Sequence, residues 1–123
     1  MAEVLELPLR GRRILVVEDD PIIAMGLCSL LEDAGGAVVG PASTLEEAFR
    51  LVEKDNLSAA VLDVRLERGD TLPLANLLLT RRIPFVFQTS DPGLVAGLYP
   101  EVPVLRKPFK PEQLVASLVA LLG

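Results

Sequence analysis

Short apolar runs alternate along the chain with longer segments in which apolar residues recur every three or four positions. Continuous apolar runs are typical of strands buried on both faces, and the longer spacing is typical of helices with one buried side. The runs predict five strands, within residues 14–17, 37–40, 59–64, 83–89 and 102–107. The periodic segments predict helices within residues 21–36, 43–55, 71–82 and 111–122.

Local signals mark the ends of these elements. Asp20 suits the cap of the first helix, and Ser43 or Thr44, followed by Glu46 and Glu47, predicts a capping box for the second. The stretch RLERGD predicts a loop between the third strand and the third helix, and ERGDT reads most simply as a flexible turn. Residues 90–101 hold two prolines and two glycines, so they leave room for at most a short helix.

The alternation of strands and helices predicts an α/β fold, with a doubly wound, five-stranded parallel sheet and a short or irregular fourth helix. A length of 123 residues suits one domain. We expect residues 12–123 to form that domain and residues 1–11 to form an N-terminal extension.

Composition removes several classes of function. The net charge of −5 argues against nonspecific nucleic-acid binding, which needs a basic surface. The chain has no histidine and one cysteine, which excludes a histidine-based metal site and a disulfide within the chain. No apolar run approaches the roughly 18 residues of a membrane span, and acids and a proline interrupt the first residues where a signal peptide would be apolar. We expect a soluble cytoplasmic protein.

The residues with candidate functional side chains directly follow or end the predicted strands. The first strand is followed by Glu18 and Asp19, the third by Asp63, the fourth by Thr89 and the fifth by Lys107. Ligands of open α/β sheets bind outside these carboxyl ends. Two carboxylates 4 Å apart repel each other by about 1 kcal/mol in water and about 4 kcal/mol at an effective dielectric of 20. A hard divalent cation relieves this repulsion, and oxygen-only ligands favour Mg²⁺.

Asp63 stands alone at its strand end, where its carboxylate can attack phosphorus to form an aspartyl phosphate. Lys107 and Thr89 are the cation and the hydroxyl donor that such a phosphoryl group needs. Each residue also has a plainer interpretation: an acidic turn, a surface lysine, or a hydroxyl that satisfies the backbone. Their joint placement at one edge of the sheet favours the site.

The segments ILVVEDD, AVLDV, FVFQT and LRKPF, in this order and spacing, resemble the receiver domain of two-component response regulators. The resemblance covers about residues 12–122 and implies the strand order 2-1-3-4-5. It also implies that Asp63 takes phosphate from a histidine kinase or phosphotransfer protein, with no catalysis beyond the domain's own phosphorylation and dephosphorylation. The stretches VVGPASTLEEA and IPFVFQT are similar to stand-alone alphaproteobacterial receivers, which are often found near HWE-type kinases.

The resemblance also assigns roles to single residues. It implies that Asp19 binds Mg²⁺ directly, that Glu18 binds it through water, and that Arg65 contributes its backbone carbonyl. Thr89 and Lys107 match the pair that binds the phosphoryl group.

The chain departs from the family pattern at Val104, where an aromatic switch residue is usual, and Tyr99 is not in register with that position. In the family, the positions two past the phosphoacceptor and two past the threonine tune dephosphorylation. Here they are Arg65 and Asp91, opposite charges that we expect to pair over the site.

Two other functions stay open. A Mg²⁺-dependent phosphatase of the haloacid-dehalogenase type would need an acid two residues after Asp63, where Arg65 stands. A receiver-like interaction module without phosphorylation would not need the full set of site residues. The last helix also predicts a face of small or uncharged residues, which suits a homodimer mate or an output protein; its members are Gln113, Ala116, Ser117 and Ala120.

Overall fold

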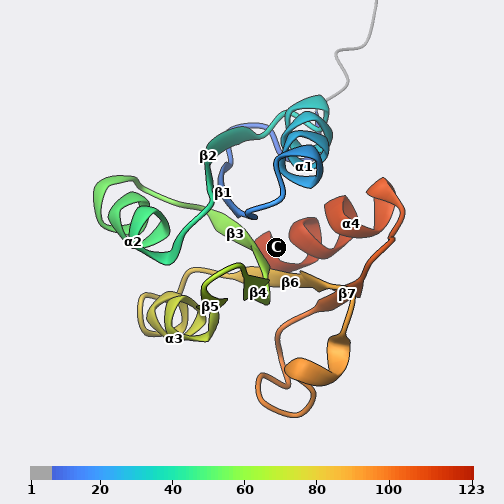
Figure 1. Ribbon diagram of the computed structural model, residues 1–123. Coiled ribbons are helices and arrows are strands. Elements are labelled where there is room, and N and C mark those ends of the chain that lie inside the picture. The colour runs from blue at the N-terminus through green and yellow to red at the C-terminus, as the bar shows by residue number, and fades with distance from the viewer. Residues whose placement is uncertain (1–6) are drawn as a thin grey trace, which may run out of the picture.

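The computed structural model describes residues 7–123, so residues 1–6 of the predicted N-terminal extension lie outside the described residues. A parallel five-stranded sheet forms the centre of the molecule, in the order β2-β1-β3-β6-β7 (Figure 1). Its strands are β1 (Arg13–Val17), β2 (Ala37–Ala42), β3 (Ala59–Asp63), β6 (Phe85–Thr89) and β7 (Val104–Arg106). The predicted doubly wound α/β fold and its strand order are confirmed.

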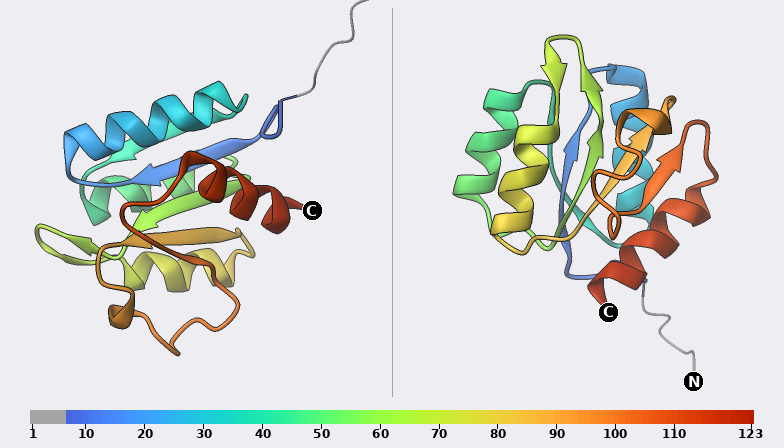
Figure 2. Two further views of the ribbon diagram at one scale, coloured as in Figure 1. Left: turned by 90° about the vertical axis from the view of Figure 1, so that its right-hand side faces the viewer. Right: turned by 90° about the horizontal axis from the view of Figure 1, so that it is seen from below.

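Four α-helices cover the two faces of this sheet (Figure 2). They are α1 (Pro21–Asp33), α2 (Leu45–Lys54), α3 (Leu72–Thr80) and α4 (Pro111–Leu122). Leu31 of α1 and Leu118 of α4 belong to one buried apolar cluster, and Val52 of α2 and Leu78 of α3 belong to the other. Helices α1 and α4 therefore share one face of the sheet, and α2 and α3 share the opposite face.

The N-caps predicted for α1 and α2 are present, but the capping box of α2 is incomplete, because Glu47 Oε1 accepts from the N–H of Ser43 and not from that of the N-cap Thr44. The side chain of Asp20 accepts hydrogen bonds from the backbone N–H groups of Ile22 and Ile23, at 2.9 and 3.3 Å. Thr44 Oγ1 accepts from the N–H of Glu47 at 3.1 Å, which satisfies a free donor at the start of α2.

The prediction of a loop at residues 65–70 is wrong. Residues Arg65–Leu66 (β4) and Gly69–Asp70 (β5) form a small antiparallel hairpin, which projects beyond the carboxyl edge of the sheet (Figure 2). Two-residue strands are too short to show a period, so the sequence pattern could not reveal them. Gly69 has φ +103°, a conformation that favours glycine and lets the hairpin turn.

Residues 90–101 form the short, irregular connection that the sequence predicts. Their one regular element is a 3₁₀ turn, η1 (Pro92–Leu94). Tyr99 anchors the segment: its ring packs edge-on against Phe87 with centroids 5.4 Å apart, and its hydroxyl donates to Asn76 Oδ1 at 2.8 Å. An aromatic residue thus lies against β6 although Val104 occupies the usual aromatic position.

The start of the described chain packs onto the domain. Leu9 is fully buried, and its N–H donates to the carbonyl of Ala34 at 2.8 Å. The domain boundary at residue 12 stays a prediction. Within residues 7–123, no helix is both long and apolar enough to cross a membrane.

Candidate functional site

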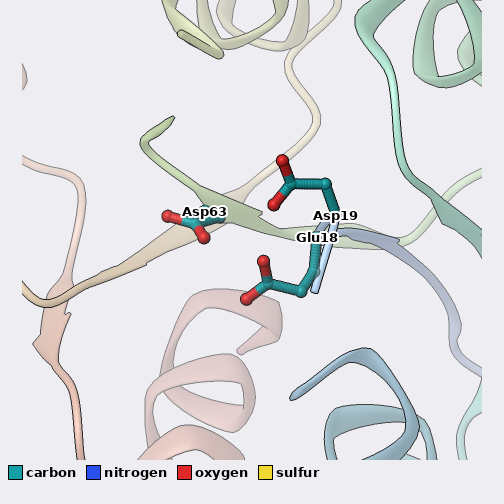
Figure 3. A group of neighbouring side chains, drawn as sticks. All are labelled: Glu18, Asp19 and Asp63. Atoms are coloured by element: carbon teal, nitrogen blue, oxygen red, sulfur yellow. The ribbon is translucent and has the colours of Figure 1, made fainter. Parts of the chain in front are cut away.

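Three carboxylates meet at the carboxyl edge of the sheet (Figure 3). Glu18 and Asp19 directly follow β1, and Asp63 is the last residue of β3. Each contributes an oxygen that lies within 4.8 Å of the others. The register of the parallel strands, which pairs Val17 with Leu62, brings these positions together. We call Glu18, Asp19 and Asp63 the acidic cluster.

Lys107 lies between two members of the cluster. Its Nζ donates to Glu18 Oε1 and to Asp63 Oδ2, at 3.0 Å each. Strand β7 positions this lysine, because the N–H of Lys107 donates to the carbonyl of Thr89 at 2.8 Å. The peptide bond that follows, to Pro108, is cis.

The pKa values of these groups reflect burial and pairing. Burial, followed by the neighbouring Glu18 carboxyl, raises the pKa of Asp63 from 3.8 to about 6, although the ammonium group of Lys107 acts in the opposite direction. The pKa of Glu18 is lowered instead: burial opposes this, but hydrogen bonds with Gln88, Asp63 and Lys107 outweigh burial. The pKa of Lys107 is raised, because its two carboxylate partners outweigh its own burial.

Thr89 is buried beside the cluster but is not hydrogen-bonded to it. It ends β6, where it pairs with Arg106, the last residue of β7 before Lys107. Its Oγ1 accepts from the N–H of Asp91 at 3.0 Å. The plainer interpretation, a strand-end hydroxyl that satisfies the backbone, describes its contacts in this structure.

The expected ion pair between Arg65 and Asp91 is absent from the described residues, and that prediction is wrong. Both side chains are exposed, and neither takes part in an ion pair within residues 7–123. An exposed pair gains little from Coulomb attraction after the entropy cost of fixing two side chains. The N–H of Arg65 instead donates to Asp63 Oδ1 at 3.3 Å. The proposed role of the Arg65 carbonyl stays a prediction.

The β4–β5 hairpin contacts the cluster through its backbone. The N–H of Glu67, at the start of the hairpin turn, donates a short hydrogen bond to Asp19 Oδ2. At the base of the hairpin, the fully buried Thr71 donates its hydroxyl to the carbonyl of Asp63 at 2.6 Å. Sequence reasoning missed both contacts: a backbone donor leaves no mark in a sequence, and Thr71 resembles an ordinary residue at the start of a helix.

Gln88 is a further residue that the sequence prediction missed. It is fully buried on β6, and its Nε2 donates to Glu18 Oε1 at 3.1 Å. A polar residue inside the apolar run FVFQT is the signal that could have identified it.

The donor set of the cluster fits a hard divalent cation. Every side-chain ligand of the cluster is a carboxylate oxygen, the kind of ligand that Mg²⁺ selects. Burial first, and the Glu18 carboxyl second, raise the pKa of Asp63 and so disfavour its charged form, which a bound cation would stabilise. Asp19 is partly exposed, which leaves the cluster an open side.

A groove of about 780 Å³ lies elsewhere on the molecule, between α1 and α4. It is mainly apolar, and two acids, Asp33 and Glu112, lie along it. Ala116 of the predicted small-residue face lines this groove, and Gln113, Ala116 and Ala120 are exposed as expected.

Comparison with known proteins agrees with this geometry. The family model described as "Response regulator receiver domain" matches residues 14–119. The chain belongs to this family. The recognition drawn from ILVVEDD, AVLDV, FVFQT and LRKPF is confirmed, whereas the association with HWE-type kinases stays a prediction.

The chain is similar to several regulators, and it covers a different share of the length of each. The phyllosphere-induced regulator PhyR of Methylorubrum extorquens is 37% identical over 108 residues, which cover 84% of this chain and 40% of PhyR. The solution structure of SdrG from Sphingomonas melonis Fr1 superposes with a TM-score of 0.80 at 40% identity, covering 94% of this chain and 98% of SdrG. A variant of the anti-anti-sigma factor PhyR from Bartonella quintana gives a TM-score of 0.82 at 25% identity, with coverages of 95% and 51%. The receiver domain thus spans about half or less of either PhyR protein.

Proposed function

We propose that this receiver domain is the phosphoacceptor of a two-component system and that Asp63 receives the phosphoryl group. The observation that carries the proposal is the position of Lys107, whose ammonium group lies 3.0 Å from both Glu18 Oε1 and Asp63 Oδ2. A cation held at an aspartate of raised pKa is placed to meet the charge of a phosphoryl group on that aspartate. Membership of the receiver family supports the same assignment.

In the reaction, a carboxylate oxygen of Asp63 attacks the phosphorus of a phosphohistidine on the partner protein. The phosphorus–nitrogen bond breaks, and its electron pair stays on the histidine ring. Lys107 then moves its hydrogen bond from the carboxylate to a phosphoryl oxygen. Thr89 Oγ1 accepts from the N–H of Asp91, so its own hydroxyl proton is free to be donated to a phosphoryl oxygen.

Mg²⁺ is the cofactor that the acidic cluster suits. Asp19 and Asp63 would bind it directly, Glu18 through water, and Arg65 through its backbone carbonyl. When bound, the cation neutralises charge that develops on the transferring phosphoryl oxygens.

The phosphatase alternative is disfavoured by the residue two positions after Asp63. Arg65 stands there with an exposed side chain, and it cannot serve as the general acid that such a phosphatase requires. A receiver-like interaction module that is not phosphorylated is disfavoured by the acidic cluster. Three carboxylates so close together repel one another, which lowers stability unless they bind a ligand. We therefore propose that the domain catalyses no reaction beyond its own phosphorylation and dephosphorylation.

The partners follow from this chemistry. A sensor histidine kinase or a phosphotransfer protein of the bacterial cytoplasm would supply the phosphoryl group. The single-domain length of SdrG supports an output through protein contacts or a role as a phosphate sink. The exposed face of α4, with Ala116 and Ala120, would dock an output protein or a second copy of the domain. Replacing both residues, as Ala116→Arg with Ala120→Glu, should weaken such docking and leave phosphorylation unchanged.

Intact-mass spectrometry after incubation with acetyl phosphate tests the proposal. Addition of one phosphoryl group that requires Mg²⁺ and is lost on treatment with hydroxylamine supports an acyl phosphate. Sustained turnover of unrelated phosphoesters would indicate a phosphatase instead. No phosphoryl addition from acetyl phosphate or from a phosphorylated histidine kinase would leave the interaction module as the function.

A further inference from the structure

Gln88 is completely buried, and only one of its two polar side-chain atoms has a hydrogen-bond partner among residues 7–123. Its Nε2 donates to Glu18 Oε1 at 3.1 Å, the same oxygen that accepts from Lys107 Nζ at 3.0 Å. Its own Oε1 has no hydrogen-bond partner among residues 7–123. A polar side chain with an unpaired oxygen thus borders the acidic cluster from within the sheet.

Packing alone does not explain a glutamine here. A buried acceptor without a partner lowers stability, and an apolar side chain of similar size would avoid that cost. Val86 lies on the same strand and the same face of the sheet, and it is fully buried as an apolar residue. What distinguishes position 88 from position 86 is contact with Glu18.

The shared oxygen of Glu18 suggests what the amide does. Lys107 and Gln88 both hold Glu18 Oε1 in this structure, and Lys107 also holds Asp63. Once Lys107 turns to a phosphoryl group on Asp63, Gln88 is the side chain that still donates to that oxygen.

We propose that Gln88 is a positioning residue: it keeps Glu18 oriented toward the divalent cation while Lys107 serves the phosphoryl group. This inference rests on the proposed function, because it assumes that the cluster binds a cation and that Asp63 is phosphorylated. Partners that orient metal ligands in this way typically change metal affinity by about 10–100-fold when they are removed.

The variant Gln88→Met tests the inference, because methionine keeps similar bulk and removes the amide. Without Mg²⁺, its Tm should stay at or above that of the wild type, since the change removes an unpaired acceptor along with the hydrogen bond. Its Kd for Mg²⁺, measured by calorimetry, should rise about tenfold. The Mg²⁺ concentration that gives half-maximal phosphorylation by acetyl phosphate should rise in parallel.

Val86→Ala is the matched control. It opens a cavity on the same strand and sheet face, so Tm should fall while the Kd for Mg²⁺ stays unchanged. If Gln88→Met fails to fold, Gln88→Ala replaces it with the same expected loss of Mg²⁺ affinity.

A glutamine variant that binds Mg²⁺ as tightly as the wild type overturns the inference, and a fall in Tm with unchanged affinity assigns Gln88 to packing. Failure of the proposed function has a different signature: the wild-type protein binds Mg²⁺ but gains no phosphoryl group. In that case the comparison of Mg²⁺ affinities still decides the role of Gln88.

Discussion

The backbone N–H of Glu67 donates a hydrogen bond to Asp19 Oδ2, and this contact holds the β4–β5 hairpin against the acidic cluster. The same oxygen belongs to a carboxylate that our account assigns to a divalent cation. A backbone donor and a directly bound cation compete for the same oxygen of Asp19, unlike the amide of Gln88, whose partner Glu18 would bind the cation through water. The hairpin should therefore weaken cation binding.

The variant Glu67→Pro should increase Mg²⁺ affinity about fivefold, because removing one competing hydrogen bond is worth about 1 kcal/mol. Proline lacks the N–H but suits this position: Glu67 opens the turn with negative φ, where proline is favoured. Glu67→Ala, which keeps the N–H, is the control for loss of the side-chain charge. Equal affinities in the proline and alanine variants would show that the hydrogen bond does not compete.

Asp63 should make the protein less stable as pH rises without a divalent cation. Its pKa is about 6 in the folded protein against an ordinary value of 3.8. Between about pH 4 and pH 6 the folded state binds more protons than the unfolded state, so the free energy of unfolding falls as pH rises and stays lower above that range.

Asp63→Asn removes this titration. The stability gain of the variant over the wild type should be larger at pH 7.5 than at pH 4, by on the order of 1 kcal/mol, since partial solvation screens the charge. Urea unfolding at the two pH values measures the difference. A gain that is the same at both pH values would mean that Asp63 titrates normally.

Lys107→Met should destabilise the protein by about 1–3 kcal/mol near pH 8 without Mg²⁺, because Glu18 and Asp63 lose their shared counter-charge. Mg²⁺ should restore more stability to this variant than to the wild type, since the cation then supplies the missing charge. Lys110→Met, at an exposed lysine nearby, is the control. If both lysine variants respond to Mg²⁺ as the wild type does, the pairing of Lys107 contributes little.

The outline of the site could be predicted because its residues follow apolar strands. Asp63 and Lys107 each end such a run, and parallel topology places all strand ends at one edge. The contacts that tune the site could not be predicted in the same way. Thr71 and the N–H of Glu67 form their hydrogen bonds at a hairpin whose strands are too short to give a sequence pattern. Gln88 is a polar residue within a mainly apolar run, and the run as a whole predicts only a buried strand.

The wrong prediction of an ion pair between Arg65 and Asp91 has a related cause. Sequence position places both residues near the site, but their exposed side chains have no burial to fix them in contact. Strand register fixes backbone positions to within a residue, whereas exposed side chains depend on loop geometry that the register does not determine.

The most direct experiment asks whether Asp63 is the residue that becomes phosphorylated. The test compares the wild-type protein with Asp63→Asn and with the control Asp33→Asn. Asp33 is an exposed aspartate at the far end of α1. Each protein would be incubated with acetyl phosphate and Mg²⁺ and analysed by intact-mass spectrometry. The wild type and Asp33→Asn should each gain one phosphoryl group. Asp63→Asn should remain folded and gain none. An Asp63→Asn protein that gains the phosphoryl group at the wild-type level would contradict the account.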